Sequence, residues 1–406
     1  MQTIRIERLG AQGDGVAEAG VFAPFTLPGE TVRGEAAAGR IARPEILEAS
    51  PHRTAPPCPH FGTCGGCALQ HASDAFLAGW KRDQIASALA ARGLGDVEIR
   101  ETIVSPPRSR RRATFAARRT KKTVLAGFHG RGDSEIIPID ACHLVAPALL
   151  SALPAVEDAA RLGASRKKAI RALATTTEGG VDLAIEDAKP LERQELIDAA
   201  ALAERYDLAR LSWNGEVVAL RRPPAQPFGD ARVEPAPGGF LQATREGEEA
   251  IAAAVVEAVG EAGRIADLFA GCGAFALRLA VAAEVLAIEG DAAAVAALEA
   301  GWRRTPGLKR VSTEVRDLFR RPLLPIEMDG LDAIVIDPPR AGAEAQCVEI
   351  AKGGPPVVAA VSCNPATFGR DARILVDGGY RLEWAQPVDQ FRWSPHTELA
   401  ALFRRT

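Results

Sequence analysis

The sequence has no long apolar run. Its most apolar helix-like segment, residues 250–260, is interrupted by Glu257 and is far shorter than the roughly 20 residues that span a bilayer. The first seven residues also lack the apolar core of a secretory signal peptide. We therefore expect no membrane association and a cytoplasmic location, where the seven cysteines are not expected to form a disulfide framework.

Net charge is small as well, because 49 Lys and Arg residues nearly balance 52 Asp and Glu residues. Acidic residues are nevertheless missing between Arg108 and Lys122, a segment that holds eight basic residues. Apolar side chains such as Phe115 and Val124 interrupt this segment at strand-like spacing, which indicates a folded positive surface. Such a surface suits a phosphate backbone, so nucleic acid is the predicted partner; a merely solvated face is the alternative.

A chain of 406 residues is too long for one ordinary core, and two or three domains are expected. Residues 1–52 contain about five short strands with glycine turns, which predicts a small β-barrel of the oligonucleotide-binding type. Residues 53–230 predict a central α/β domain, and a proline-rich stretch marks its end. Residues 231–406 form the third predicted domain.

The third domain is predicted to be α/β, with a doubly wound, mostly parallel, Rossmann-like sheet, because extended apolar runs alternate with helical stretches. Ligands bind such sheets beyond the carboxyl ends of the strands. The residues expected at these ends are Asp267, Glu289, Asp317, Asp337 and Cys363.

Residues 264–276 indicate a strand, a glycine turn and a helix start. Gly271 permits the tight turn and a close approach of the backbone to a ligand, and Glu289 can accept both hydroxyls of a ribose. The glycine spacing also fits a dinucleotide fingerprint, so a nicotinamide oxidoreductase is an alternative. Asp267 favours S-adenosylmethionine, because a carboxylate ahead of the glycines would repel a pyrophosphate.

Cys363 follows another apolar strand and is the candidate nucleophile. Asn364 is a good N-cap and Pro365 a good first helical residue, so Cys363 stands just before a helix N-terminus. The partial positive charge of such an end favours the thiolate. A buried structural cysteine is the alternative reading.

Four segments together resemble the 5-methyluridine RNA methyltransferase family, and the resemblance covers nearly the whole chain. They are Asp267-Leu268-Phe269-x-Gly271-x-Gly273, Asp337-Pro338-Pro339-Arg340-Ala341-Gly342, Ser362-Cys363-Asn364-Pro365-Ala366-Thr367 and His396-Thr397-Glu398. The resemblance implies an S-adenosylmethionine-dependent enzyme with an N-terminal TRAM-type barrel, in which Cys363 is the nucleophile and Glu398 the base. The predicted cofactor-binding residues are Gln242, Phe269, Gly271, Glu289, Asp317 and Asp337. Ala274 and residues 389–396 differ from the family's usual sequence motifs.

The chemistry of this family accounts for the residue types. C5 of uracil is a poor nucleophile, but a thiolate that adds to C6 turns C5 into an enolate carbon that can attack a sulfonium methyl. A carboxylate must then remove the C5 proton before the thiolate can leave. We therefore predict a monomeric enzyme that methylates a flipped-out uridine in an RNA loop.

The early cysteines form a separate group, with three in one loop and a fourth much later. They are Cys58, Cys64, Cys67 and Cys142. Four thiolates suit an iron–sulfur cluster or zinc. Zinc remains an alternative because nearby histidines could also serve as its ligands. These histidines are His60, His71 and His143.

Family members that modify ribosomal RNA resemble this chain in carrying a [4Fe-4S] cluster at such cysteines, whereas those that modify transfer RNA generally lack both cluster and barrel. The resemblance thus implies a [4Fe-4S] cluster, with a structural and RNA-binding role, and 23S rRNA as substrate. The alternatives are a tRNA uridine-C5 methyltransferase and an RNA-binding protein with a vestigial methyltransferase fold.

Overall fold

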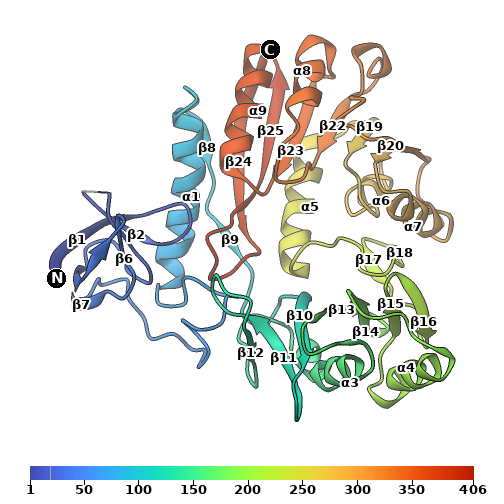
Figure 1. Cartoon of the computed structure of the whole chain (residues 1–406). Coiled ribbons are helices and arrows are strands. Elements are labelled where there is room, and N and C mark those ends of the chain that lie inside the picture. Colours follow the sequence, from blue (N-terminus) through green and yellow to red (C-terminus); the bar gives the residue numbers. More distant parts are fainter. Residues whose placement is uncertain (19) are drawn as a thin grey trace.

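The structure, a computed structural model, describes residues 1–18 and 20–406 (Figure 1). These residues form three large sheets and one two-stranded sheet. The N-terminal sheet, drawn in blue, lies on one side of helix α1 (Asp74–Ala90), and the C-terminal sheet, drawn in orange and red, lies on the other (Figure 1). None of the described helices combines the length and the hydrophobicity needed to cross a bilayer.

The N-terminal sheet has the strand order β5-β6-β3-β2-β1-β4-β7, and β1 pairs antiparallel with both β2 and β4. Its small core includes Ile6 and Val32. Among the described residues no pairing joins β5 to β7, so closure into the predicted barrel is not shown, and residue 19 lies outside the described part. The strands are β1 (Gln2–Leu9), β2 (Gly15–Ala17), β3 (Phe22–Ala23), β4 (Thr31–Gly34), β5 (Ala36–Ala37), β6 (Arg40–Ile41) and β7 (Glu45–Glu48).

The central sheet has the order β12-β11-β10-β13-β14-β15-β16 and is antiparallel except between β14 and β15. In β10 the alternate residues Ala113, Phe115 and Ala117 are buried and join one core with Val156 and Ala159 of α3. The strands are β10 (Arg112–Arg119), β11 (Val124–His129), β12 (Ile136–Pro138), β13 (Ile170–Thr177), β14 (Gly180–Glu186), β15 (Arg210–Trp213) and β16 (Glu216–Leu220). The helices are α2 (Pro147–Ser151), α3 (Leu153–Gly163) and α4 (Arg193–Arg205), and β17 (Gln226–Phe228) with β18 (Ala231–Val233) form the two-stranded sheet.

The C-terminal sheet has the order β21-β20-β19-β22-β23-β25-β24-β8, and β9 also pairs with β24. The first five strands are parallel, and both faces of the sheet are covered, which explains the apolar runs of the central strands β22 and β23. The strands are β19 (Arg264–Leu268), β20 (Glu284–Glu289), β21 (Val311–Val315), β22 (Ala333–Ile336), β23 (Val357–Ser362), β24 (Tyr380–Asp389) and β25 (Glu398–Arg405). The helices are α5 (Arg245–Val259), α6 (Ala276–Leu279), α7 (Ala292–Arg303), α8 (Glu344–Gly353), α9 (Pro365–Asp377) and the 3-10 helix Pro325–Glu327.

The predicted doubly wound, mostly parallel sheet is therefore confirmed. Four of the five predicted strand ends lie within one residue of the observed ones, and β21 ends two residues before Asp317. Two short strands were not predicted: β8 (Glu98–Ile99) and β9 (Ile103–Val104) come from the segment assigned to the central domain but pair with β24. The C-terminal sheet thus includes residues from well before residue 231.

Candidate active site

A cavity of about 820 Å³ lies at the carboxyl ends of the parallel strands, a size typical of ligand pockets. The cavity is also lined by Arg110, Arg112 and Thr114, which lie at or just before the start of β10 in the central sheet. The cavity therefore lies between the central and the C-terminal sheet. All eight residues predicted to be catalytic or cofactor-binding line this one cavity. They are Gln242, Phe269, Gly271, Glu289, Asp317, Asp337, Cys363 and Glu398.

The loop after β19 has a conformation that most residues avoid. Gly271 has φ +55° and Phe269 has φ +62°, a left-handed value that is strained for a residue with a side chain. The Glu289 carboxylate fixes this loop, because it accepts the N–H of Gly271 at 2.9 Å, while its other oxygen accepts those of Gly290 at 2.6 Å and Asp291 at 2.9 Å. A carboxylate has about four acceptor positions, so Glu289 retains about one for a ligand hydroxyl.

Asp267 does not face the cavity. Its side chain is fully buried, and Oδ2 accepts the N–H of Ala276 at 2.9 Å, where it holds the start of α6. Burial raises the pKa of this carboxyl to about 8. The sequence argument that Asp267 would repel a pyrophosphate was therefore wrong, because the buried carboxyl does not line the cavity.

Cys363 lies where the sequence predicted, just before α9. Asn364 caps this helix by accepting the N–H of Ala366 at 3.1 Å, and Pro365 is its first residue. Burial, followed by the charges of Glu398 and Asp337, raises the pKa of Cys363 to about 11. Desolvation therefore outweighs the effect of the helix end.

Glu398 is the first residue of β25, and the pairing of β23 with β25 sets it beside Cys363. Ser362 pairs with Leu399 in this antiparallel ladder, so the next residue of one strand stands opposite the previous residue of the other. Glu398 is only 3% exposed, and burial raises its pKa to about 8, with the charge of Asp337 as the second cause. Its carboxylate accepts a hydrogen bond from Gln390 Nε2 at 2.9 Å.

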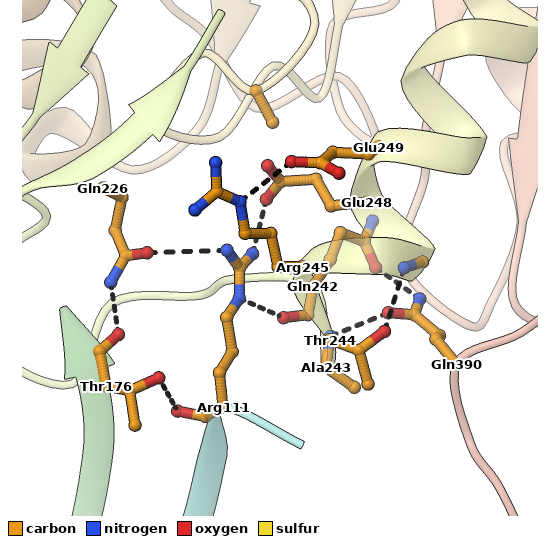
Figure 2. A network of polar contacts seen from close by, with 12 residues as sticks. Arg111, Thr176, Gln226, Gln242, Ala243, Thr244, Arg245, Glu248, Glu249 and Gln390 are labelled. Atoms are coloured by element: carbon orange, nitrogen blue, oxygen red, sulfur yellow. Dashed lines mark hydrogen bonds and ion pairs between the residues drawn. The ribbon is translucent and has the colours of Figure 1, made fainter. Parts of the chain in front are cut away.

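A buried polar network that the sequence did not reveal links the central sheet to the cavity. Figure 2 shows Arg111 between Gln226 and Glu248. Its guanidinium donates to Glu248 Oε2 at 2.5 Å and to the carbonyl of Gln242 at 3.0 Å. Arg111 is 5% exposed, so its prediction as a residue of the RNA-binding surface was wrong. No signal in the sequence separates this arginine from its basic neighbours.

The rest of the basic segment divides in two. Arg110 and Arg112 are half-buried and line the cavity, and Arg112 donates to the carbonyl of Gly238 at 2.9 Å. The remaining basic side chains stand on the far end of β10 and its hairpin or on the preceding loop, where most are exposed. They are Arg108, Arg118, Arg119, Lys121 and Lys122.

The four early cysteines carry free thiols and lie near one another. Burial, together with the negative charge of the other three cysteines when they are thiolates, raises the pKa of Cys67 to about 12. Backbone N–H groups of Gly66 and Leu144 donate to the sulfurs of Cys64 and Cys142, each at 3.4 Å. Within the described residues, however, no group of three or more His, Cys, Asp or Glu side chains is arranged to hold a metal ion.

The histidines considered as zinc ligands are otherwise engaged where the structure shows contacts for them. His60 Nε2 lies 2.7 Å from Asp140 Oδ1, and His71 is buried against the rings of Phe25 and Phe61. A single zinc ion needs its ligands within about 2.3 Å of one point, which no described group provides. The thiol donor set fits an iron–sulfur cluster by its chemistry, but the cluster itself stays a prediction.

Comparisons with known proteins agree with this geometry. The tRNA (Uracil-5-)-methyltransferase family model matches residues 238–406. An uncharacterized RNA methyltransferase of Rhizobium meliloti is 48% identical, over 99% of both chains. The 23S rRNA (uracil(1939)-C(5))-methyltransferase of Nitrosococcus oceani is 32% identical, over 100% of this chain and 96% of the other. The chain belongs to the uracil-C5 RNA methyltransferase family.

The protein is thus an S-adenosylmethionine-dependent RNA methyltransferase, and the nicotinamide and vestigial alternatives fall away. The structure of the Pyrococcus abyssi tRNA (uracil-54, C5)-methyltransferase in complex with S-adenosyl-L-homocysteine has the same fold, with a TM-score of 0.78 over 99% of both chains at 21% identity. Because a tRNA enzyme shares the fold along its whole length, the N-terminal units do not distinguish ribosomal from transfer RNA enzymes.

Proposed function

We propose that this enzyme methylates C5 of a uridine in 23S rRNA through a covalent bond between Cys363 and C6. The pairing of β23 with β25 carries the proposal, because it sets a thiol and a carboxyl side by side on the wall of the cavity. Six other residues that line the cavity are proposed to bind S-adenosylmethionine. They are Gln242, Phe269, Gly271, Glu289, Asp317 and Asp337.

The reaction follows from these two groups. S-adenosylmethionine, when bound, supplies the electrophilic methyl group and a positively charged sulfonium. The Cys363 thiolate adds to C6, the electrons of the C5–C6 double bond pass into an enolate, and C5 takes the methyl group as S-adenosylhomocysteine leaves. The Glu398 carboxylate then removes the C5 proton, and the C–H electrons restore the double bond and expel the thiolate.

Both groups are protonated more readily here than in water, so the site needs positive charge to ionise them. Arg340 lies in the cavity wall, and its charge lowers the pKa of Cys363. A bound sulfonium acts in the same direction on Cys363 and Glu398. We therefore expect the thiolate to form mainly in the cofactor-bound enzyme.

The substrate RNA is proposed to cross the exposed end of the central sheet. Ala117 pairs with Ile170, so the β10–β11 hairpin that carries Lys121 and Lys122 lies at the same end of the sheet as the exposed Arg166 and Lys167, which precede β13. These four cations form no ion pair in the part of the chain that the structure describes. β10 joins this end to the cavity over about 24 Å, at roughly 3.4 Å per residue, so one RNA can reach both.

Domain roles are proposed on the same basis. Residues 1–52 form a TRAM-like RNA-binding unit, residues 53–230 a central RNA-binding unit, and residues 231–406 the methyltransferase unit, which β8 and β9 extend. Cys58, Cys64, Cys67 and Cys142 are proposed to hold a [4Fe-4S] cluster, supported by four neighbouring thiols and two N–H···S contacts.

A trapping experiment tests the mechanism. Glu398→Gln should still add to C6 and transfer the methyl group, but proton removal should stall, so a methylated protein–RNA adduct should accumulate on a denaturing gel. Cys363→Ala should form no adduct and turn over nothing, while Cys347→Ala, a buried cysteine in α8, should behave as wild type. Normal turnover by Glu398→Gln, or an adduct with Cys363→Ala, contradicts the assigned roles.

The choice of RNA is tested separately, by mapping 5-methyluridine in ribosomal and transfer RNA from cells that lack the protein. Support for 23S rRNA comes from the 32% identical relative, whereas the tRNA alternative is supported by the fold of the Pyrococcus enzyme. Loss of one 23S site with intact tRNA is expected. Loss confined to tRNA would assign the enzyme to the alternative.

A further inference from the structure

We propose that Gln390 is a positioning residue that holds the Glu398 carboxylate ionised and aligned for removal of the C5 proton. This inference rests on the proposed function, because it concerns the step that Glu398 performs. Gln390 follows β24 in the loop of residues 390–397, the stretch that departs from the family's usual wording, and it is 1% exposed.

All hydrogen-bonding positions of the Gln390 amide but one acceptor lone pair are used. Its Oε1 accepts the N–H of Ala243 at 2.7 Å, and its Nε2 donates to Gln242 Oε1 at 2.6 Å (Figure 2). The second Nε2 hydrogen is directed to Glu398 Oε2, 2.9 Å away. Gln390 therefore bridges a predicted cofactor-binding residue and the predicted base.

The orientation of this amide is fixed by its partners. In the flipped orientation Nε2 would face the Ala243 N–H, two donors together, and Oε1 would face the Glu398 carboxylate, two acceptors together. Gly247 of α5 reinforces the position, since a Cβ added there would lie 2.6 Å from Gln390 Cβ. Glu398 thus always meets a hydrogen-bond donor.

The two glutamines also separate two acids. Gln242 Nε2 lies 3.4 Å from Asp337 Oδ2, so a row of carboxyl, amide, amide and carboxyl runs from Glu398 to Asp337. The charge of Asp337 raises the pKa of Glu398, and the hydrogen bond from Gln390 lowers it. A hydrogen bond to a carboxylate favours the ionised form, which is the form that can accept a proton.

The test compares the resolution of the methylated adduct across pH 6–9 in single turnovers. Gln390→Met, which removes the amide at similar volume, should form the adduct at the wild-type rate but resolve it about tenfold more slowly at pH 7. The midpoint of resolution should move up by about one pH unit, the shift that corresponds to a tenfold change in ionisation. Gln390→Glu, which keeps the shape but replaces the amide donors with an acid that repels the Glu398 carboxylate when ionised, should shift it further and serves as the second variant.

The pH midpoint of a single variant does not report on Glu398 alone, because other groups near Glu398 are charged or titrate. They are Asp337, Arg340, Cys363, His396 and Arg110. The test therefore compares the midpoints of several variants. Gln386 provides a control: it lies in β24, the strand that leads to Gln390, is also buried, and donates only to the carbonyls of Glu101 and Pro387. Gln386→Met should leave the midpoint unchanged.

The outcomes separate the two proposals. A wild-type enzyme that forms no methylated adduct, or a Glu398→Gln variant that resolves it normally, refutes the proposed function itself. If Glu398→Gln stalls while both Gln390 variants resolve the adduct at the wild-type midpoint, only the role of Gln390 is overturned. A midpoint shift in Gln386→Met equal to that in Gln390→Met also overturns it.

Discussion

The carboxyl groups of Asp267 and Glu398 are buried near the strand ends and that of Asp337 is half-buried there, and desolvation raises the pKa of each. Such an acid ionises less readily in the folded chain than in the unfolded one, so it lowers the stability of the fold at neutral pH. For Glu398 the loss of stability is linked to its proposed role, because a base that removes a proton from carbon needs a pKa near the working pH. Raised pKa values at Glu398 and Asp337, which line the cavity, therefore indicate chemistry, whereas Asp267 holds the start of α6.

Glu398→Gln should raise the free energy of unfolding at pH 8.5 by roughly 2 kcal/mol or more, since each unit of pKa shift corresponds to about 1.4 kcal/mol. The sign follows from a folded pKa of about 8 against an ordinary value near 4.5: the destabilisation is absent below pH 4.5 and grows until about pH 8. Urea unfolding at pH 5 and pH 8.5 measures it.

Glu383 offers a control of opposite sign, because Arg381 lowers the pKa of that carboxyl. Glu383→Gln should not stabilise the fold at pH 8.5. Equal loss of stability by Glu398→Gln at both pH values would show that Glu398 is not destabilised by burial.

At the scale of elements, the apolar runs predicted the central parallel strands β22 and β23 well, because strands buried on both faces have few polar positions. β8 and β9 were missed because two residues each are too short to show a period, and their partner β24 lies far along the chain. The motifs located the cavity, but Gln390 and Arg111 gained their roles only from partners distant in sequence. A block of like charges cannot show which member becomes buried.

The β10–β11 hairpin should bind RNA, whereas Arg111 should stabilise the fold. Replacing Lys121, Lys122 and Lys167 by alanine should weaken RNA binding and reduce the slope of log affinity against log salt by about 2, at roughly 0.7 per lost phosphate contact. Affinity for S-adenosylmethionine and the free energy of unfolding should stay unchanged. Filter binding at several salt concentrations gives the slope.

Arg111→Ala is the informative contrast. It leaves Glu248 with Arg278 as its remaining ion-pair partner, so unfolding should require about 3 kcal/mol less, as expected when a buried pair is broken. The salt slope should remain that of wild type. A slope that falls for Arg111→Ala and not for the triple variant would reverse the two assignments.

For the whole molecule, the 390–397 loop is where the N-terminal half meets the catalytic unit. Lys81 of α1 is fully buried and donates to Asp389 Oδ1 at 2.5 Å and to the carbonyl of Phe391 at 3.1 Å. The N–H groups of Ala68 and Leu69, next to Cys67, both donate to the carbonyl of Trp393. The cysteine loop therefore holds the same loop that carries Gln390 and leads into Glu398.

Loss of the proposed cluster should consequently loosen the 390–397 loop without emptying the cofactor site. Anaerobically purified enzyme should be brown with about four irons per chain. Cys67→Ser should lose the iron and speed hydrogen exchange at the amides of Ala68 and Leu69. It should also lower kcat about tenfold, because a looser 390–397 loop misplaces the base. The affinity for S-adenosylmethionine should change less than about twofold, because the loop after β19 is not affected. Cys347→Ser in α8 should change neither iron content nor exchange. A colourless protein with one zinc per chain would contradict the cluster, and unchanged exchange after iron loss would contradict its hold on the loop.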